Sequence, residues 1–189
     1  REIRSELTEI AEKYGDDRRT ALIEDHSAKL PAVETKPIAE DTAILRLADG
    51  QIRRMSPRMV DKFIQQPGMA GEVVQTIQTA TDESLYIFTN LGNCFMLDIA
   101  KIPETMRFKE RGSLLTGLVA GLADGETAVQ LLCARSEEMG KYGDLLFVTK
   151  NGQVKRTAAG EYGIRRSRFA AINLKGEDQV IAVTAVKPE

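Results

Sequence analysis

Histidine and cysteine are scarce in this sequence of 189 residues, and their scarcity excludes several kinds of site. The single histidine, His26, lies in a polar segment, which argues against a hydrolytic triad or a metal centre built from several histidines. The two cysteines, Cys94 and Cys133, lie 39 positions apart without neighbouring ligand residues, so they predict neither a disulfide framework nor a zinc site. This use of cysteine favours a reducing, cytoplasmic environment.

Long apolar runs and catalytic patterns are also missing. No stretch approaches the ~20 apolar residues of a membrane-spanning helix, and the start, Arg1-Glu2-Ile3-Arg4, has neither a methionine nor a signal-peptide core. We therefore expect a piece of a longer protein. No glycine-rich phosphate loop precedes a helix, and no tyrosine has a paired base or an acidic metal cluster beside it. The sequence thus predicts no catalytic and no metal-binding residue in this chain.

The charge balance gives a mixed indication of the partner. The 26 basic and 28 acidic residues leave a net charge of −2 with a pI of about 5.7, which argues mildly against nucleic acid. The distribution is uneven, however: residues 1–40 carry −3, residues 41–130 carry −2 and residues 131–189 carry +3. The basic last third therefore leaves local binding of a polyanion open.

The first residues have the spacing of a short amphipathic helix. Apolar residues recur every three or four positions and form one seam: Ile3, Leu7, Ile10 and Tyr14. Gly15 stands where a helix C-terminal cap is expected. We interpret residues 1–26 as the helical end of an upstream region and residues 27–41, with two prolines and no periodicity, as a linker.

From residue 42 onward the pattern changes to short apolar runs broken by turns. Three hairpins align on Gly50, Gly92 and Gly152, each with an apolar strand before the glycine and a second strand after it. Asp49-Gly50 and Asn151-Gly152 are dipeptides typical of type I′ turns, in which both central residues need positive φ, whereas Leu91-Gly92 is a poorer match.

A Gly-Glu dipeptide follows each hairpin, and an apolar strand follows each dipeptide. The dipeptides begin at Gly71, Gly125 and Gly176, and further strands are predicted before the last two, at residues 114–119 and 169–174. Four strands per repeat, in repeats of approximately 42–82, 83–134 and 143–189, are typical of propeller blades. The predicted fold is therefore all-β, a propeller-like β-pinwheel of about three four-stranded blades after a short N-terminal helix.

Basic residues form the strongest candidate site. Residues 150–168 contain six basic groups and one acid, and Arg53 and Arg54 follow Gly50 as Lys155 and Arg156 follow Gly152. Equivalent positions in successive blades would align these charges for a phosphate backbone, although the middle repeat carries Phe95 and Met96 there. Solubility or protection of strand edges is the alternative explanation. The candidate DNA-binding residues are Arg53, Arg54, Lys109, Arg111, Lys150, Lys155, Arg156, Arg165, Arg166 and Arg168.

Two sets of residues resemble a known family. The string Tyr14-Gly15-Asp16-Asp17-Arg18-Arg19-Thr20 is similar to the end of the breakage-reunion core in the A subunit of bacterial type IIA topoisomerases, DNA gyrase and topoisomerase IV. The later strings Val154-Lys155-Arg156-Thr157, Glu161-Tyr162 and Ile164-Arg165-Arg166 resemble blades of that subunit's C-terminal β-pinwheel.

The resemblance implies a domain that binds and bends double-stranded DNA in the bacterial cytoplasm, at the nucleoid. The catalytic tyrosine would belong to another part of the subunit, so this piece would not cleave DNA by itself. The parent enzyme would be an A-subunit dimer working with a B subunit, with ATP and Mg²⁺ bound through other regions and no cofactor here. A propeller-type protein-interaction scaffold without DNA binding is the alternative.

The sequence departs from the family pattern in two places. Gyrases usually carry a basic, glycine-rich box soon after the first hairpin, and the segment Phe63-Ile-Gln-Gln-Pro-Gly-Met-Ala-Gly71 contains no lysine or arginine. We therefore expect a protein closer to topoisomerase IV than to a supercoiling gyrase. Family members also tend to have five or six blades, whereas three repeats are found here.

Overall fold

The structure, a computed structural model, describes residues 2–16, 39–69 and 71–187. The chain divides into two units, Arg1–Lys36 and Pro37–Glu189, which we describe separately. Residues 17–38, which include most of the predicted linker, lie outside the described residues. Within the described residues, no helix has the length and apolarity needed to cross a membrane.

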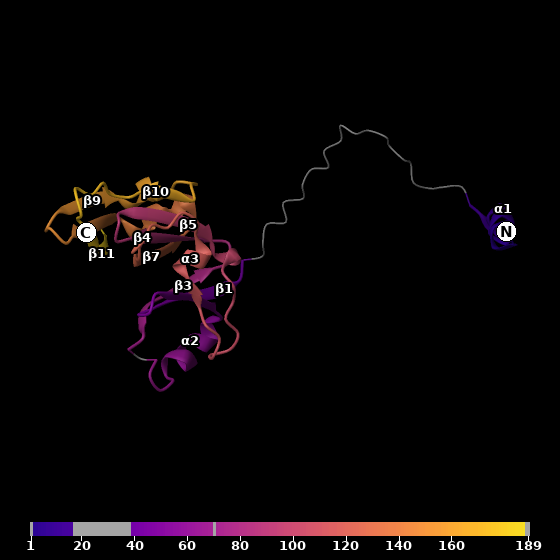
Figure 1. The fold of residues 1–189 in the computed structure, drawn as a ribbon, viewed down its shortest axis with the longest axis horizontal. Helices are drawn as coiled ribbons and strands as arrows, with labels where there is room; N and C mark the ends of the chain where they lie inside the picture. Colours follow the sequence, from indigo (N-terminus) through magenta and orange to yellow (C-terminus); the bar gives the residue numbers. More distant parts are fainter. Residues whose placement is uncertain (1, 17–38, 70, 188–189) are drawn as a thin grey trace. The chain divides into compact units, whose positions relative to one another are not determined.

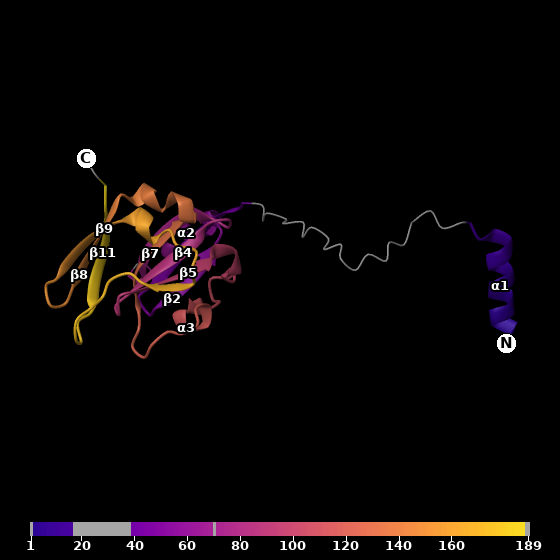
Figure 2. The ribbon, with the colours of Figure 1, turned by 90° about the horizontal axis from the view of Figure 1, so that it is seen from above.

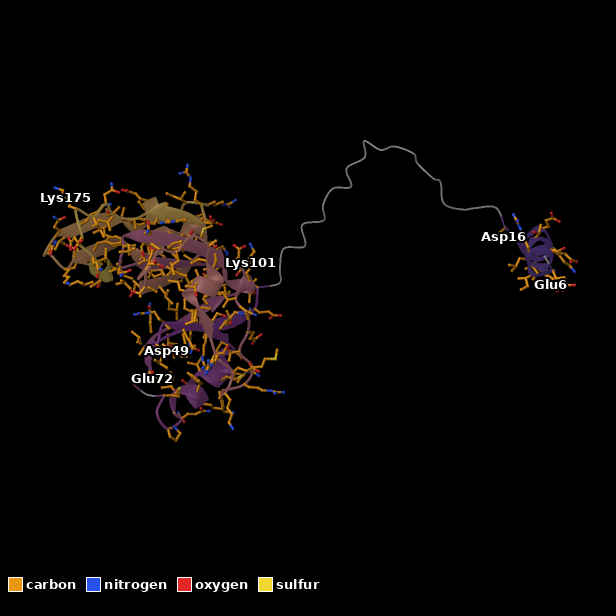
Figure 3. All side chains as sticks on the ribbon, in the orientation of Figure 1. Glu6, Asp16, Asp49, Glu72, Lys101 and Lys175 are labelled. Atoms are coloured by element: carbon orange, nitrogen blue, oxygen red, sulfur yellow. The ribbon has the colours of Figure 1, made fainter. Side chains whose placement is uncertain are left out.

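The described part of the first unit is the helix α1, Glu2–Tyr14, which ends before Gly15 as predicted. Its apolar seam is exposed, with 54% of Ile10 and 74% of Ile3 accessible. The charged side chains of α1, including Glu6, and Asp16 just beyond its end are drawn in Figure 3.

The second unit contains three antiparallel sheets (Figure 1; Figure 2). The first sheet has the order β3-β1-β2-β6 and is formed by Asp41–Leu47 (β1), Gln51–Met55 (β2), Val73–Ala80 (β3) and Ser113–Leu114 (β6). The second has the order β10-β5-β4-β7 and is formed by Ser84–Thr89 (β4), Asn93–Asp98 (β5), Ala128–Ala134 (β7) and Arg168–Ala170 (β10). The third has the order β11-β8-β9 and is formed by Asp144–Thr149 (β8), Val154–Ala158 (β9) and Val180–Val186 (β11).

Short helices join several of the strands. The α-helices are Pro57–Ile64 (α2) and Leu115–Leu118 (α3), and the 3-10 helices are Ile99–Lys101 (η1), Ser136–Tyr142 (η2) and Ala159–Tyr162 (η3). The strand predicted over residues 114–119 is therefore wrong for most of its length. A short apolar run fits a helix and a strand equally well, and here only its first residue, Leu114, pairs as a strand.

Each complete sheet takes its outer strand from the following repeat. The strand β6 precedes β7 in the chain but pairs with β2 of the first sheet, and β10 of the third repeat pairs with β5 of the second sheet. The expectation that every repeat supplies all four strands of its own blade is therefore corrected. Within the described residues the third sheet has no such strand beside β9, and it has three strands.

The three hairpin loops share one geometry, which differs from the predicted type I′ turns. Among the described residues only glycines have positive φ, so Asp49 and Asn151 do not adopt the conformation that a type I′ turn requires. Instead, Gly50, Gly92 and Gly152 close three-residue loops, with φ of 83°, 78° and 78°. Because the residue before the glycine needs no positive φ, Leu91 fits this loop as well as Asp49 does.

The segment at each Gly-Glu dipeptide holds the hairpin loop of its own repeat. In every repeat the N–H of the first loop residue donates to the carbonyl oxygen of the residue just before the strand that follows the dipeptide, which is β3, β7 or β11. These bonds are Ala48 to Glu72 at 2.7 Å, Asn90 to Thr127 at 3.0 Å and Lys150 to Gln179 at 2.8 Å. Figure 3 shows Asp49 and Glu72 close together at this end of the first sheet.

The core lies between the sheets, and the strand β4 contributes to both of its main layers. Tyr86 and Phe88 face a cluster shared with the third sheet, whereas Leu85 and Ile87 face a cluster shared with the first sheet. Both faces of β4 are buried, which explains its continuous apolar run. A third cluster lies between the first sheet and α2 and includes Phe63.

Candidate nucleic-acid interface

The two basic residues of β2 are engaged by neighbouring residues of the domain. Arg53 is 8% exposed, its guanidinium lies 4.8 Å from the centroid of the Phe63 ring, and its Nη1 donates to Phe108 O at 3.2 Å. Burial lowers the pKa of Arg53. Arg54 is half-buried and lies 3.8 Å from Glu104. The prediction that Arg53 presents its charge along an outer edge is therefore wrong.

The segment of residues 105–112, which belongs to the second repeat, brings other cations to this edge of the first sheet. It runs alongside β2: Thr105 N–H donates to Arg54 O at 2.7 Å, and Gly112 N–H donates to Gln51 Oε1 at 2.6 Å. Lys109 and Arg111 of this segment are exposed. The second repeat thus supplies the free charges of the first sheet.

The second sheet likewise receives basic residues from the following repeat, although its own hairpin carries Phe95 and Met96 at the equivalent positions. β10 places Arg168 opposite Phe95, with its guanidinium 5.4 Å from the ring centroid and its Nη1 2.7 Å from Gly121 O. Met96 N–H donates to Ser167 O at 3.0 Å, and Arg165 lines a surface pocket together with Met96. Figure 1 shows β10 beside β5. Cations of the third repeat therefore lie on the outer edge of the second sheet.

On the third sheet the cations belong to the hairpin itself. Lys150 is exposed in the loop, and Lys155 Nζ donates to Ala171 O at 3.0 Å while remaining exposed. Arg156 is exposed but pairs with Asp144. All three sheets therefore carry basic side chains on, or next to, their outer strands. Seven of the ten candidates are exposed and make no ion pair with a described residue, and we call them the cation row: Lys109, Arg111, Lys150, Lys155, Arg165, Arg166 and Arg168.

Two acidic residues close to this row are turned inward. Glu126 is 5% exposed and accepts hydrogen bonds from Thr89 Oγ1 at 2.6 Å, Asn93 Nδ2 at 2.8 Å and Ala123 N–H at 3.0 Å. Burial alone would raise the pKa of Glu126, but these hydrogen bonds and the charge of Arg168 bring the pKa below its ordinary value. Asp178, 4% exposed, accepts from the N–H of Asn151 in the third hairpin. The Gly-Glu pattern located these two segments in the sequence. It did not indicate that carboxylates within them accept hydrogen bonds from the hairpins.

Both cysteines and two of the tyrosines are engaged in packing. Burial raises the pKa of both thiols, that of Cys133 to about 12. Tyr162 lies within 5.5 Å to 5.7 Å, centroid to centroid, of the rings of Phe88 and Phe147, and Tyr142 Oη donates to Cys133 O at 2.8 Å. Both tyrosines therefore serve packing and hydrogen bonding inside the domain.

The sequence matches the family described as "DNA gyrase C-terminal domain, beta-propeller" over residues 83–134 and 143–187, which together make up just over half of the chain. The chain belongs to this family. The matched segments contain the second and third hairpins and all of the candidate cations except Arg53 and Arg54.

Curated relatives of the chain are the A subunits of type IIA topoisomerases. The A subunit of DNA gyrase from Streptococcus pyogenes serotype M1 is 34% identical over 195 residues, and the A subunit of DNA topoisomerase 4 from Bacillus subtilis strain 168 is 30% identical over 192 residues. These alignments cover 96% and 99% of this chain. The chain spans 22% and 23% of the length of the two relatives, so it corresponds to about a fifth of either relative.

Solved structures agree with the pinwheel assignment. The crystal structure of the C-terminal domain of DNA topoisomerase IV has a TM-score of 0.64 and 27% identity, covering 77% of this chain and 45% of that one. The Escherichia coli ParC C-terminal domain has a TM-score of 0.60 at 17% identity, covering 79% and 58%, and supports the fold alone. The predicted all-β, propeller-like architecture and the predicted family are thus confirmed.

Proposed function

We propose that this domain binds double-stranded DNA through the cation row and bends it for the topoisomerase to which the domain belongs. The observation that carries the proposal is the presence of exposed cations without ion pairs on, or next to, the outer strands of all three sheets. Phosphates lie along a duplex at one negative charge per ~1.7 Å, so a line of lysines and arginines matches the backbone. Such contacts hold a duplex without reading its bases.

The pairing of β6 and β10 with strands of the preceding repeat supports a continuous contact between the cation row and a duplex. When the hairpins of the three repeats are compared in the sequence, the second one carries Phe95 and Met96 where the others carry basic residues. Taken by sheet, the charge of Arg168 lies over Phe95, and the first sheet receives Lys109 and Arg111 from the second repeat. A duplex following the three outer strands would meet basic side chains at each sheet, and curvature of the path would bend it.

The domain's contribution to the whole enzyme is to hold a duplex segment for strand passage. The catalytic tyrosine, the B subunit, the second A subunit, ATP and Mg²⁺ belong to other parts of that bacterial, cytoplasmic enzyme. Residues 63–71, which run from the last turn of α2 toward the start of β3, contain no lysine or arginine. We therefore propose a role closer to topoisomerase IV than to a gyrase, whose tight wrapping needs a basic segment there.

Equilibrium binding to a short labelled duplex, measured by fluorescence anisotropy, tests the proposal. The variant Lys155→Ala/Arg165→Ala/Arg166→Ala removes three members of the cation row. The control, Arg58→Ala/Lys62→Ala/Arg107→Ala, removes three exposed cations outside the cation row. We expect the first variant to bind duplexes of every sequence at least tenfold more weakly at low salt, and the control to bind within twofold of the unaltered chain.

Two results would contradict the proposal. Equal weakening by both variants would show that binding depends on the total charge of the domain and not on the cation row. Negligible binding by the unaltered chain, together with capture of a protein partner, would favour the interaction scaffold instead, which the net charge of −2 suits.

A further inference from the structure

Each of the three sheets carries an ion pair on, or directly after, the strand that follows its hairpin. The pairs are Arg54–Glu104, Lys101–Asp98 and Arg156–Asp144. The pair of the second sheet is the most exposed of the three, with 76% of the Lys101 side chain and 52% of the Asp98 side chain accessible. Lys101 Nζ lies 2.7 Å from Asp98 Oδ2. Because exposed ion pairs contribute little to stability, this pair can exchange partners at low cost.

The carboxylate of Asp98 has no counterpart in the other two repeats. Asp98 stands six positions after Gly92, whereas Ser56 and Ala158 stand six positions after the other two hairpin glycines. Asp98 is also the only charged residue of β5, which contains no lysine or arginine. β5 therefore contributes a negative charge to the outer part of its sheet, where β2 and β9 contribute positive charges.

Lys101, labelled in Figure 3, lies between the two strands that cross over from the following repeats. One surface pocket is lined by Lys101 together with Ser113 and Leu114 of β6, and a neighbouring pocket is lined by Lys101, Asp98 and Ser167, which directly precedes β10. The cation row reaches the first sheet next to β6 and the second sheet at β10. Lys101 therefore stands between two parts of that row, and both crossing strands that border it are present in the chain.

A phosphate and the carboxylate of Asp98 compete for the same ammonium group. The hydrogen bond from Lys101 and the charge of Asp98 raise the pKa of Lys101, so the lysine is charged and paired before a duplex arrives. A lysine strengthens duplex binding because its contact with a phosphate releases a counterion. Lys101 gives little such gain while Asp98 is present, because the carboxylate that it leaves must recruit a counterion in its turn. Asp98 also lines a pocket with Arg165, a member of the cation row.

We propose that Asp98 limits the grip of the second sheet on DNA by holding Lys101, and that Lys101 becomes a further phosphate contact when this carboxylate is neutralised. The inference rests on the proposed function, since it takes a duplex to lie along the cation row. Its consequence is a weaker hold between the first and second sheets, which lets a duplex segment leave more readily at that position.

The test is a salt series of duplex binding by fluorescence anisotropy with the full chain. The variant Asp98→Asn removes the charge and keeps the shape, and the Asp98 side chain makes no cap hydrogen bond to η1 that the change would break. The matched control is Asp61→Asn, which alters the net charge equally at an exposed position of α2. We expect Asp98→Asn to bind at least fivefold more tightly than the unaltered chain at low salt, and the control to bind within twofold. The slope of log K against log salt should steepen by about 0.9 for Asp98→Asn, the value of one further phosphate contact.

Two more variants show whether the gain acts through Lys101. Lys101→Ala and Asp98→Asn/Lys101→Ala complete a double-mutant cycle with Asp98→Asn. Once Lys101 is absent, neutralising Asp98 frees no cation, so the double variant should bind within twofold of Lys101→Ala. Both side chains are exposed, so urea midpoints equal to that of the unaltered chain are expected and verify the fold of every variant.

Two results would overturn the inference and leave the proposed function intact. In the first, Asp98→Asn binds no more tightly than Asp61→Asn. In the second, the gain persists in the absence of Lys101, which would assign the effect to direct repulsion between Asp98 and the duplex. The absence of duplex binding by both the unaltered chain and Asp98→Asn would contradict the proposed function itself, and this inference with it.

Discussion

The buried carboxylate of Glu126 is a sensitive point in the second sheet, because it joins the hairpin to the segment before β7. Its Oε1 accepts hydrogen bonds from Thr89 and Asn93, and its Oε2 accepts one from Ala123 N–H. The substitution Glu126→Ala leaves these three donors without their acceptor. Each buried polar group left unsatisfied costs about 1–3 kcal/mol, and water reaches some of them, so we expect a loss of about 2–4 kcal/mol in unfolding free energy.

The pH dependence of this loss follows from the pKa of Glu126. Burial acts to raise the pKa, and the hydrogen bonds from Ala123, Thr89 and Asn93 together with the charge of Arg168 lower it below the ordinary value. A carboxylate whose pKa is depressed by folding stabilises the fold above its unfolded pKa, about 4.3 for glutamate, and loses that contribution as the pH falls through the folded value. The difference between the unaltered chain and Glu126→Ala should therefore be full at neutral pH and shrink below about pH 4.

Urea unfolding followed by circular dichroism at several pH values measures both effects. The control is Glu177→Ala, which removes an exposed carboxylate from the corresponding segment of the third repeat and should change stability by less than about 0.5 kcal/mol. The reasoning is refuted if Glu126→Ala is no more destabilising than this control. A difference that stays constant between neutral pH and about pH 3 would refute the assignment of the pKa shift.

Two further predictions concern buried features of the same sheets. Gly50 and Gly92 both have positive φ, so alanine costs about 1–2 kcal/mol at either, but a Cβ at Gly92 would lie 2.6 Å from Ile172 O whereas one at Gly50 meets nothing within 4 Å. Urea midpoints should therefore fall further for Gly92→Ala than for Gly50→Ala, and equal midpoints would contradict the packing of the third repeat on the second hairpin. Because burial raises the pKa of Cys94 and Cys133, a thiol reagent at mildly alkaline pH should modify both only after denaturation, and rapid reaction of the folded chain would contradict their burial.

The sequence predicted local structure well because the hairpin signal is local. An apolar run, a glycine and a second run specify two paired strands, and all three hairpins formed where Gly50, Gly92 and Gly152 predicted them. The turn type was wrong, since a three-residue loop with one left-handed glycine gives the same spacing. The exchange of β6 and β10 was not predictable from the pattern, because it depends on pairing between repeats far apart in the chain.

The candidate site shows the same division between local and long-range information. Arg53 and Lys155 stand three positions after equivalent glycines, yet Arg53 is covered by the segment containing Phe108 and Lys155 is exposed. The repeat pattern alone assigns them the same role. The two residues differ because β6, from the following repeat, pairs with β2, whereas β9 has no second partner among the described strands. The exchange also moves Arg168 onto the second sheet, where the sequence indicated a break in the basic residues.

The salt dependence of duplex binding tests the account most directly. If the seven residues of the cation row each neutralise a phosphate, the slope of log K against log salt approaches about −6, from ~0.9 per contact. Removing Lys155, Arg165 and Arg166 together should then reduce the slope to about −3.6, with equal weakening for duplexes of different sequence. A slope near zero for the unaltered chain, or one that these substitutions leave unchanged, would contradict binding through the cation row.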